Sequence, residues 1–311
     1  MNTYPGFTTE RKFQSKTAPV ADFYNWITYP LRPCRTGWAK PFRADGIVPG
    51  RILHAGCATG SQTRSLAYTF PDAEIIGVDF SEGSLAHARK WLEDPMLKNV
   101  TFQKADLTQS LERFGTFDMV LSYGVLHHIR DVDRAVQNIR AVLRTPESPF
   151  IVFVYGKYGR ARIAQLQEAL ALWQETVPGL TKQEKYAALW EAASSNGTFS
   201  GPRGWLKRAL VAFSPSWRQV WLSSNADAYL HPSVRYYDLD DILDLCGRNG
   251  FRFDRFVCRS GYTNRYPENE DEVLRRFHIA RPDELPRRER YSIVDRLTRP
   301  FEYEFVCYKT T

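Results

Sequence analysis

Short apolar segments alternate with helical segments between residues 51 and 155, and this alternation narrows the fold more than any other feature of the sequence. The apolar segments are RILHAG (51–56), AEIIGVDF (73–80), VTFQKADL (100–107), FDMVLSYG (117–124) and PFIVFVYG (149–156). Residues 61–69, 81–94 and 132–144 read as helices. Alternating strands and helices with short connections favour a parallel sheet wound on both faces. Right-handed crossovers then bring the carboxyl ends of the strands to one edge, where ligands bind.

The pattern changes after Gly156, and this change suggests an insertion. Residues 160–225 contain helical segments rich in tryptophan and leucine with no strand between them, and strand-like segments return at 251–260 and 301–310. We therefore expect residues 46–156 to form a core, residues 157–232 to form a helical cap over the carboxyl edge, and residues 233–311 to complete the core. Residues 1–45 are expected to form an N-terminal lid segment, with fixed anchoring of this aromatic tail on the sheet as the equal alternative.

The cysteine and charge content indicates the cellular compartment of the protein and the kinds of partner it could bind. The five cysteines are scattered without a CxxC pair, so neither a disulfide framework nor a zinc site is expected. The polar N-terminus and the absence of a membrane-length apolar run predict a cytoplasmic protein without a membrane partner. The net charge of +7 arises from interspersed charges of both signs, so a nucleic-acid partner is not expected.

The turn after the first strand narrows the choice of ligand. A strand that turns through glycines into a helix presents backbone N–H groups to a ligand. A dinucleotide fingerprint needs glycines at positions 56, 58 and 61, but positions 58 and 61 are Ala and Ser. A phosphate-binding loop with Gly-Lys followed by Ser or Thr is absent as well. NAD and nucleoside triphosphates are therefore disfavoured.

The remaining pattern resembles the first motif of the class I S-adenosylmethionine-dependent methyltransferases, acid-x-Gly-x-Gly-x-Gly. It reads here His54-x-Gly56-x-Ala58-x-Gly60, with histidine for the acid and alanine for the middle glycine. Three further segments, IIGVDFS, KADL and FDMVLSYGVLHHI, follow in the order of the family, so the likeness covers residues 50–155. The segments YLHP and LDDILDLCGRNGF resemble a bacterial branch with a helical insertion. The resemblance implies an α/β, Rossmann-like, doubly wound and mostly parallel seven-stranded sheet with a helical cap insertion.

The resemblance also implies S-adenosyl-L-methionine as the cofactor and a set of residues that bind it. Asp79 would accept hydrogen bonds from both ribose hydroxyls, because a carboxylate has two acceptor oxygens. Asp106 would accept from the adenine amino group and the Leu107 N–H would donate to the ring, although Asp106 could also be a solvated loop residue. The complete expected set is His54, Gly56, Ala58, Gly60, Asp79, Phe80, Asp106, Leu107, Ser122 and Tyr123.

Two positions of this set raise specific questions. Ala58 fits the turn if its φ angle stays negative. His54 could equally be a packed, hydrogen-bonded histidine beneath the turn, since it lacks the charge of the acid that it replaces.

Methyl transfer from a sulfonium needs alignment and, for some acceptors, a base. His127 and His128 follow the fourth strand, and histidine accepts protons near neutral pH. Adjacent residues on a helical turn point about 100° apart, so one of them should face the cavity. We favour His127, since in the family the first of these positions borders the substrate; the alternative is that both histidines pack the next helix. The expected catalytic residues are His127, Tyr123, Asp227 and His231, with no metal.

Three classes of function stay open from the sequence. A helical cap suits a methyltransferase for a small-molecule metabolite, for example in secondary-metabolite biosynthesis. An RNA or protein methyltransferase is disfavoured, because Ser122-Tyr123-Gly124-Val125 replaces the Asn/Asp-Pro-Pro-Tyr loop of many enzymes that methylate planar amino groups. The third class binds the same cofactor without transferring its methyl group, as a cyclase or lyase that consumes the aminobutyryl chain or as a binding module.

Overall fold

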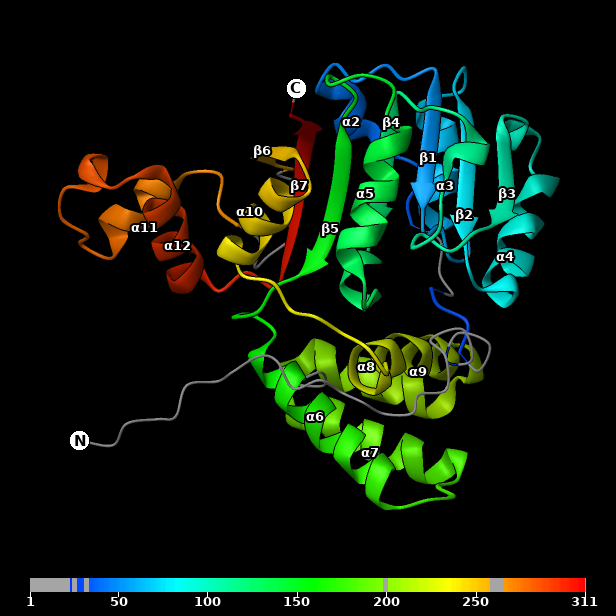
Figure 1. Ribbon diagram of the computed structural model, residues 1–311. Coiled ribbons are helices and arrows are strands. Elements are labelled where there is room, and N and C mark those ends of the chain that lie inside the picture. Colours follow the sequence, from blue (N-terminus) through cyan, green and yellow to red (C-terminus); the bar gives the residue numbers. More distant parts are fainter. Residues whose placement is uncertain (1–22, 24–26, 31–33, 198–200, 258–265, 311) are drawn as a thin grey trace.

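The computed structural model describes residues 23, 27–30, 34–197, 201–257 and 266–310 (Figure 1). Its centre is a seven-stranded sheet in the order β3-β2-β1-β4-β5-β7-β6. The strands are β1 (Arg51–Ala55), β2 (Glu74–Asp79), β3 (Val100–Lys104), β4 (Met119–Tyr123), β5 (Phe150–Tyr155), β6 (Phe251–Phe256) and β7 (Glu302–Lys309). The predicted α/β class and the mostly parallel seven-stranded sheet are confirmed.

Strands β1 to β5 pair in parallel, and β7 lies antiparallel between β5 and β6. Pairing of β5 with β7 runs from Phe150 opposite Cys307 to Tyr155 opposite Glu302. Because β1 to β5 are parallel, their carboxyl ends share one edge of the sheet, which we call the carboxyl edge.

Helices cover both faces of the sheet. The first face carries α2 (Lys40–Ala44), α3 (Ser61–Thr69) and α4 (Glu82–Arg89), and a buried cluster there joins Phe42, Leu66 and Leu85 to Ile52, Ile75 and Leu121. The second carries α5 (Val132–Val142) and α10 (Leu239–Arg248), where Val136, Ile139 and Ile242 pack with Leu53, Val120 and Val152. The short 3-10 turns are η1 (Lys90–Glu93), η2 (Pro95–Leu97), η3 (Glu112–Phe114), η4 (Leu126–His128) and η5 (Pro282–Glu284).

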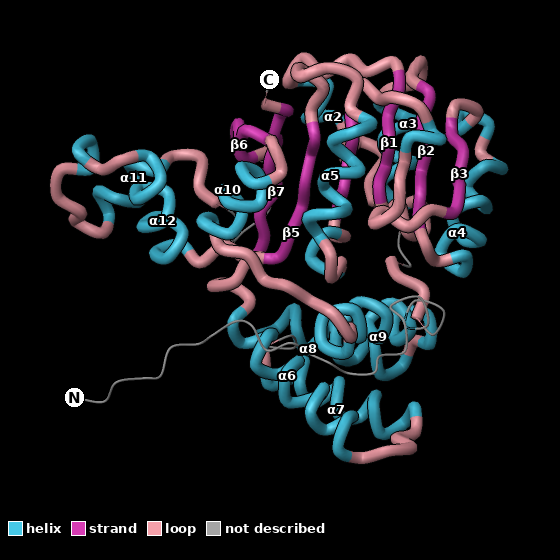
Figure 2. The backbone as a smooth tube through the Cα atoms, viewed as in Figure 1, coloured by secondary structure: helices cyan, strands magenta, loops and turns pink. Residues whose placement is uncertain are grey.

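A helical layer lies across the carboxyl edge (Figures 1 and 2). It consists of α6 (Ala161–Thr176), α7 (Lys182–Ser195), α8 (Gly201–Phe213) and α9 (Pro215–Leu230), and we call it the helical insertion. It has its own buried cluster, which includes Ile163, Leu189, Val211, Trp221 and Tyr229. The N-terminal residues Phe23 and Ile27 join this cluster. The exact domain boundaries stay a prediction.

The basic stretch near the end of the chain forms α12 (Arg287–Thr298), which follows α11 (Glu270–Arg276) beyond the β6 side of the sheet (Figure 1). Its arginines are paired with acids: Arg288 contacts Asp240 and Asp244 of α10, and Arg290 contacts Glu270. These contacts tie α12 to α10 and α11.

Candidate functional site

Gly56 begins the turn that leaves β1, and the packing around it requires glycine. The N–H groups of Gly56 and Cys57 donate to the carbonyl of Val78 in β2, at 2.8 and 2.9 Å. Gly56 has a φ of +82°, and a Cβ atom there would lie 2.3 Å from Cγ2 of Val125. The turn therefore holds β1, β2 and the segment after β4 in close contact.

Ala58 stands at the middle glycine position. Its φ is +46°, so the condition of a negative φ is not met. A left-handed backbone costs a residue with a Cβ about 1–2 kcal/mol. The Ala58 N–H offsets part of this cost, because it donates to Oδ2 of Asp79 at 2.8 Å.

The carboxylate of Asp79 is held at the end of β2 by two backbone donors. Besides the bond from Ala58, its Oδ1 accepts from the Ser81 N–H at 2.9 Å. Burial raises the pKa of Asp79, and the backbone donors act in the opposite direction. Since a carboxylate oxygen accepts more than one hydrogen bond, both oxygens can still receive a diol. This is the position at which the family resemblance implies ribose binding.

His54 lies beneath the turn and is hydrogen-bonded to α3. Its Nδ1 lies 2.7 Å from the hydroxyl of Thr63. Burial lowers the pKa of His54 to about 3, so the imidazole is neutral and brings no negative charge to this position. Its contact with the cofactor stays a prediction, and the observed bond ties β1 to the helix that follows it.

The other expected cofactor residues lie along the same edge. Asp106 is exposed, and its Oδ1 accepts from both the N–H and the hydroxyl of Thr108 at 2.8 Å. The buried Leu107 is fixed through its carbonyl by Asn138, and Phe80 is half-buried beside Asp79. The hydroxyl of Ser122 is fully buried and has no hydrogen-bond partner in the described part of the chain.

Tyr123 lies apart from the other expected catalytic residues. Its ring stacks on Phe153 at 4.3 Å and meets Trp38 edge-on at 4.8 Å. These contacts belong to the face of the sheet that carries α2 and α3.

His127, His231 and Asp227 do come together, around Tyr155 at the end of β5. The His127 ring stacks on Tyr155 at 3.8 Å, and the Tyr155 hydroxyl donates to Oδ2 of Asp227 at 3.2 Å. The His231 ring stacks on His128 at 3.7 Å. We call His127, His128, Tyr155, Asp227 and His231 the ring cluster. It joins η4, β5 and the end of α9, so it lies between the sheet and the helical insertion.

His128 also belongs to the ring cluster, so the expectation that it points elsewhere is wrong. The two histidine rings are 4.2 Å apart. The reason is the chain that returns from α9: the Nδ1–H of His128 donates to the carbonyl of Ser233 at 2.9 Å, and the Arg235 N–H donates to the carbonyl of His127 at 2.7 Å. This return holds both histidines beneath the insertion.

Burial keeps the histidines of the ring cluster uncharged. It lowers the pKa of His127 well below the ordinary value, and the neighbouring His128 and Arg160 lower it further. The pKa of His231 is also lowered well below its ordinary value by burial. Neither ring nitrogen of His127 has a hydrogen-bond partner among the described residues, although the side chain is 1% exposed.

Sequence reasoning missed Arg160, which covers the other side of this cluster. Its guanidinium carbon lies 3.5 Å from the centre of the Tyr155 ring, and its Nε–H donates to the carbonyl of Phe301 at 3.0 Å. Only its place shortly after β5 could have drawn attention to it, since nothing in the local sequence distinguishes it from other arginines.

A segment near the N-terminus passes over the glycine turn. The Ser223 hydroxyl of α9 donates to the carbonyl of Thr28 at 2.5 Å, and the Thr59 hydroxyl donates to the carbonyl of Pro30 at 2.7 Å. Residues 27–30 are thus bonded both to the insertion and to the turn. Tyr24 and Trp26 lie outside the described residues. The lid role of residues 1–45 stays a prediction.

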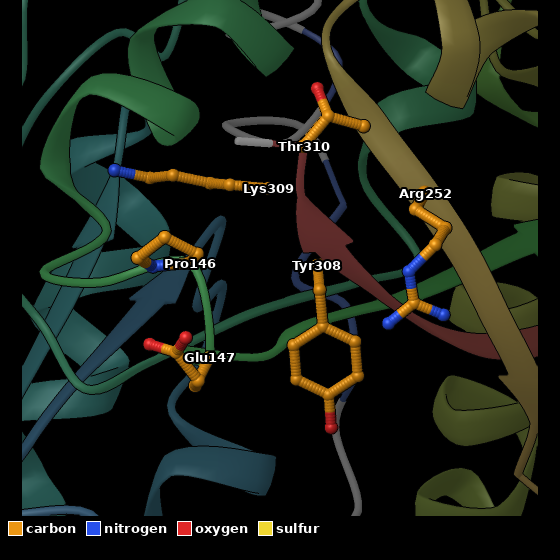
Figure 3. Close-up of a pocket in the computed structure, with 6 residues that line it drawn as sticks. All are labelled: Pro146, Glu147, Arg252, Tyr308, Lys309 and Thr310. Atoms are coloured by element: carbon orange, nitrogen blue, oxygen red, sulfur yellow. The ribbon is translucent and has the colours of Figure 1, made fainter.

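A separate hollow of about 540 Å³ lies at the opposite edge of the sheet (Figure 3). Its lining residues are Pro146, Glu147, Arg252, Tyr308, Lys309 and Thr310. They surround the start of β5 and the end of β7, far along the strands from the ring cluster, and the Lys309 ammonium donates to the carbonyl of Leu143. The hollow is broad and open, and it contains none of the residues discussed above.

The described residues contain no group of three or more His, Cys, Asp and Glu side chains suited to a metal ion. None of their helices is both long and apolar enough to cross a membrane.

Comparison with known proteins identifies relatives that match about half of this chain or less. The family described as a methyltransferase domain matches residues 52–146. An uncharacterised protein of Synechococcus sp. is 35% identical over 176 residues, which make up 51% of this chain and 42% of that protein. A malonyl-[acyl-carrier protein] O-methyltransferase of Geobacter sulfurreducens is 30% identical over 135 residues, 43% of this chain and 48% of that enzyme. The chain spans less than half the length of these relatives.

One solved structure resembles the whole fold. PKMT2 from Rickettsia typhi in complex with AdoHcy has a TM-score of 0.61 and is 16% identical. The match covers 90% of this chain and 55% of that chain. At this identity the likeness shows the fold.

Proposed function

Because the chain belongs to the class I S-adenosylmethionine-dependent methyltransferases, we propose that it transfers a methyl group from S-adenosyl-L-methionine to a small-molecule acceptor held between the carboxyl edge and the helical insertion. The observation that supports this best is the ring cluster, which closes the space between the sheet and α9 with buried polar side chains. An acceptor held beneath the helical insertion would be covered by it, which suits a small substrate better than a polymer.

The residues along the edge fit the cofactor. Two backbone N–H groups fix the orientation of the Asp79 carboxylate, whose oxygens can each accept a further hydrogen bond. The buried Ser122 hydroxyl has no hydrogen-bond partner among the described residues, and a ligand could supply one. The glycine turn fixes the backbone beside Asp79, because Gly56 donates to the carbonyl of Val78 and Ala58 donates to Asp79. When bound, S-adenosylmethionine supplies an electrophilic methyl group on a sulfonium. His54 is neutral, so it cannot attract the amino end of the cofactor through charge.

His127 is the residue best suited to orient the acceptor or remove its proton. It is neutral and buried and makes no hydrogen bond to described residues, so a ring nitrogen is free to accept one from a substrate O–H or N–H. Tyr155 fixes the plane of the imidazole by stacking, and the Tyr155 hydroxyl is fixed in turn by Asp227. Asp227 and His231 are therefore proposed as positioning residues, and Tyr123 as part of the cofactor side of the site.

The test begins with the products formed from S-adenosylmethionine. Purified protein incubated with the cofactor and pools of small metabolites should produce S-adenosylhomocysteine, detected by mass spectrometry together with a product heavier by one methylene. Methylthioadenosine without a methylated product would mean that the aminobutyryl chain is consumed, and it would overturn the proposal.

A pair of variants then tests His127. His127→Ala should lower kcat by about 100-fold while the Kd of S-adenosylhomocysteine stays nearly unchanged. His278→Ala, at an exposed histidine, serves as the control. An unchanged kcat in His127→Ala across the pH range would exclude the proposed role.

A further inference from the structure

Helix α8 of the helical insertion presents a second apolar face that packs against no described element. Its inner side contributes the buried Val211 to the cluster of the insertion. On its outer side Trp205, Leu206 and Phe213 are 72%, 64% and 87% exposed. At 100° per residue, these three side chains and the exposed Ala209 and Ala212 fall within an arc of about 120°. We call this arc the outer face of α8.

The outer face is comparable to the largest apolar patch of a typical protein surface. Two aromatic side chains and a leucine with these exposures amount to roughly 400 Å² of apolar area. The largest such patch on a monomeric protein is about 300–600 Å² and is often a binding surface. Packing of the helix against α9 does not require these residues, because that contact uses the opposite side of α8.

The charged residues of α8 and of the chain on either side of it are all of one sign. The sequence has no Asp or Glu between Glu191 and Asp227, and the basic residues within this span are Arg203, Lys207, Arg208 and Arg218. Arg208 is exposed and borders the arc on the side of Ala212, whereas the exposed Lys207 lies on the other side of the helix, near Val211. Arg218 donates to the carbonyls of Val211 and Ala212, so its guanidinium lies at the end of the helix beside Phe213.

The stripe contains tryptophan and phenylalanine, with Arg208 at its border and Arg218 at its end. This combination of apolar and basic side chains matches the interface of an anionic bilayer. Apolar side chains enter the boundary between headgroups and acyl chains, and the cations contact the phosphates and carboxylates. A second copy of this chain fits less well, because it would bring two basic borders together. No described helix could cross a membrane, so contact would be at the surface.

We propose that the outer face of α8 docks the protein reversibly on anionic lipid surfaces. This differs from the expectation of no membrane partner, which was drawn from the absence of spanning segments and did not test surface binding. Docking through α8 would hold the helical insertion, and with it the ring cluster, close to amphiphilic molecules at the surface.

Co-sedimentation with lipid vesicles tests the proposal. The full chain should sediment with vesicles of phosphatidylcholine and phosphatidylserine, bind much less to phosphatidylcholine alone, and be released as salt is raised. Phe213→Ser should weaken the partition coefficient about tenfold or more. Arg208→Gln should weaken it about fivefold at low salt, and Lys207→Gln, on the other side of the helix, should weaken it less. Phe277→Ser changes a 45% exposed phenylalanine at the end of α11 and should leave binding unchanged.

Three results would overturn the proposal. The first is absence of binding to the anionic vesicles. The second is equal loss of binding in Phe277→Ser and Phe213→Ser. The third is a dimer by light scattering that Phe213→Ser dissociates while no vesicle binding is seen, which would assign the face to a second copy. Circular dichroism and binding of S-adenosylhomocysteine confirm that each variant is folded.

Discussion

Four buried histidines make the stability of this protein sensitive to acid, and His54 is the clearest case. Burial alone lowers its pKa to about 3, whereas an unfolded histidine titrates near 6.5. Below pH 6.5 the unfolded chain therefore binds a proton that folded His54 does not. By linkage the free energy of unfolding rises with pH in this range. The protein therefore becomes less stable as the pH falls below 6.5. Burial lowers the pKa of His127, His128 and His231 as well, so they act in the same direction.

The size of the effect follows from the pKa difference. At pH 5.5, one unit below the unfolded pKa, each histidine that stays neutral in the folded state removes about 1.4 kcal/mol of stability. Asp295, whose pKa burial raises to about 6, acts in the opposite direction between about pH 4 and 6, because its folded form holds the proton longer. The histidines outnumber it, so the net stability should fall on acidification.

Urea unfolding followed by circular dichroism at pH 7.5 and pH 5.5 measures the contribution of His54. His54→Asn keeps a hydrogen-bonding group near Thr63 and removes the titration, so its loss of stability between the two pH values should be about 1.4 kcal/mol smaller than that of the wild type. His278→Asn, at an exposed histidine, should behave like the wild type. The reasoning is refuted if His54→Asn and the wild type show the same pH dependence.

Three further substitutions test the cofactor side and the ring cluster. Asp79→Ala should weaken binding of S-adenosylhomocysteine by about 1.5–3 kcal/mol, the range for hydrogen bonds to a charged group, as measured by isothermal titration. The assignment would be contradicted by an unchanged Kd, or by an equal loss of affinity in Asp72→Ala, which changes an exposed aspartate. Gly56→Ala should lower the midpoint of thermal unfolding by several degrees or prevent folding, because the alanine Cβ would lie 2.3 Å from Cγ2 of Val125. An unfolding midpoint equal to that of the wild type would show that the turn can shift. Tyr155→Phe removes the bond to Asp227 and should lower kcat with little change in cofactor Kd; a loss confined to the Kd would place Tyr155 on the cofactor side.

The sheet and its glycine turn could be predicted because both depend on local sequence. Apolar runs, short connections and the order of the four motifs specify the parallel strands and the edge at which they end. The conformation of Ala58 could not be read in this way. Its positive φ is accompanied by a hydrogen bond to Asp79, which is 21 residues away in sequence. The conformational preference of alanine alone does not take such a distant contact into account.

The ring cluster was predictable only in part, for a related reason. Its members were identified one by one from their places near strand ends and after the insertion. Their assembly depends on the return of residues 231–237 along η4, more than 100 residues after His128. Arg160 was missed because its role comes from contact with Tyr155 and Phe301, and neither contact leaves a trace in the neighbouring sequence.

Burial both assembles the ring cluster and limits what His127 can do there. The same desolvation that leaves its nitrogens available to a ligand makes the imidazole a weaker base than a histidine in water. A proton taken by His127 would also lie beside His128 and Arg160, both of which oppose a positive charge. His127 is thus best suited to an acceptor that loses its proton only as the methyl group arrives, and any acid limb caused by His127 in the rate–pH profile should fall below pH 6.5.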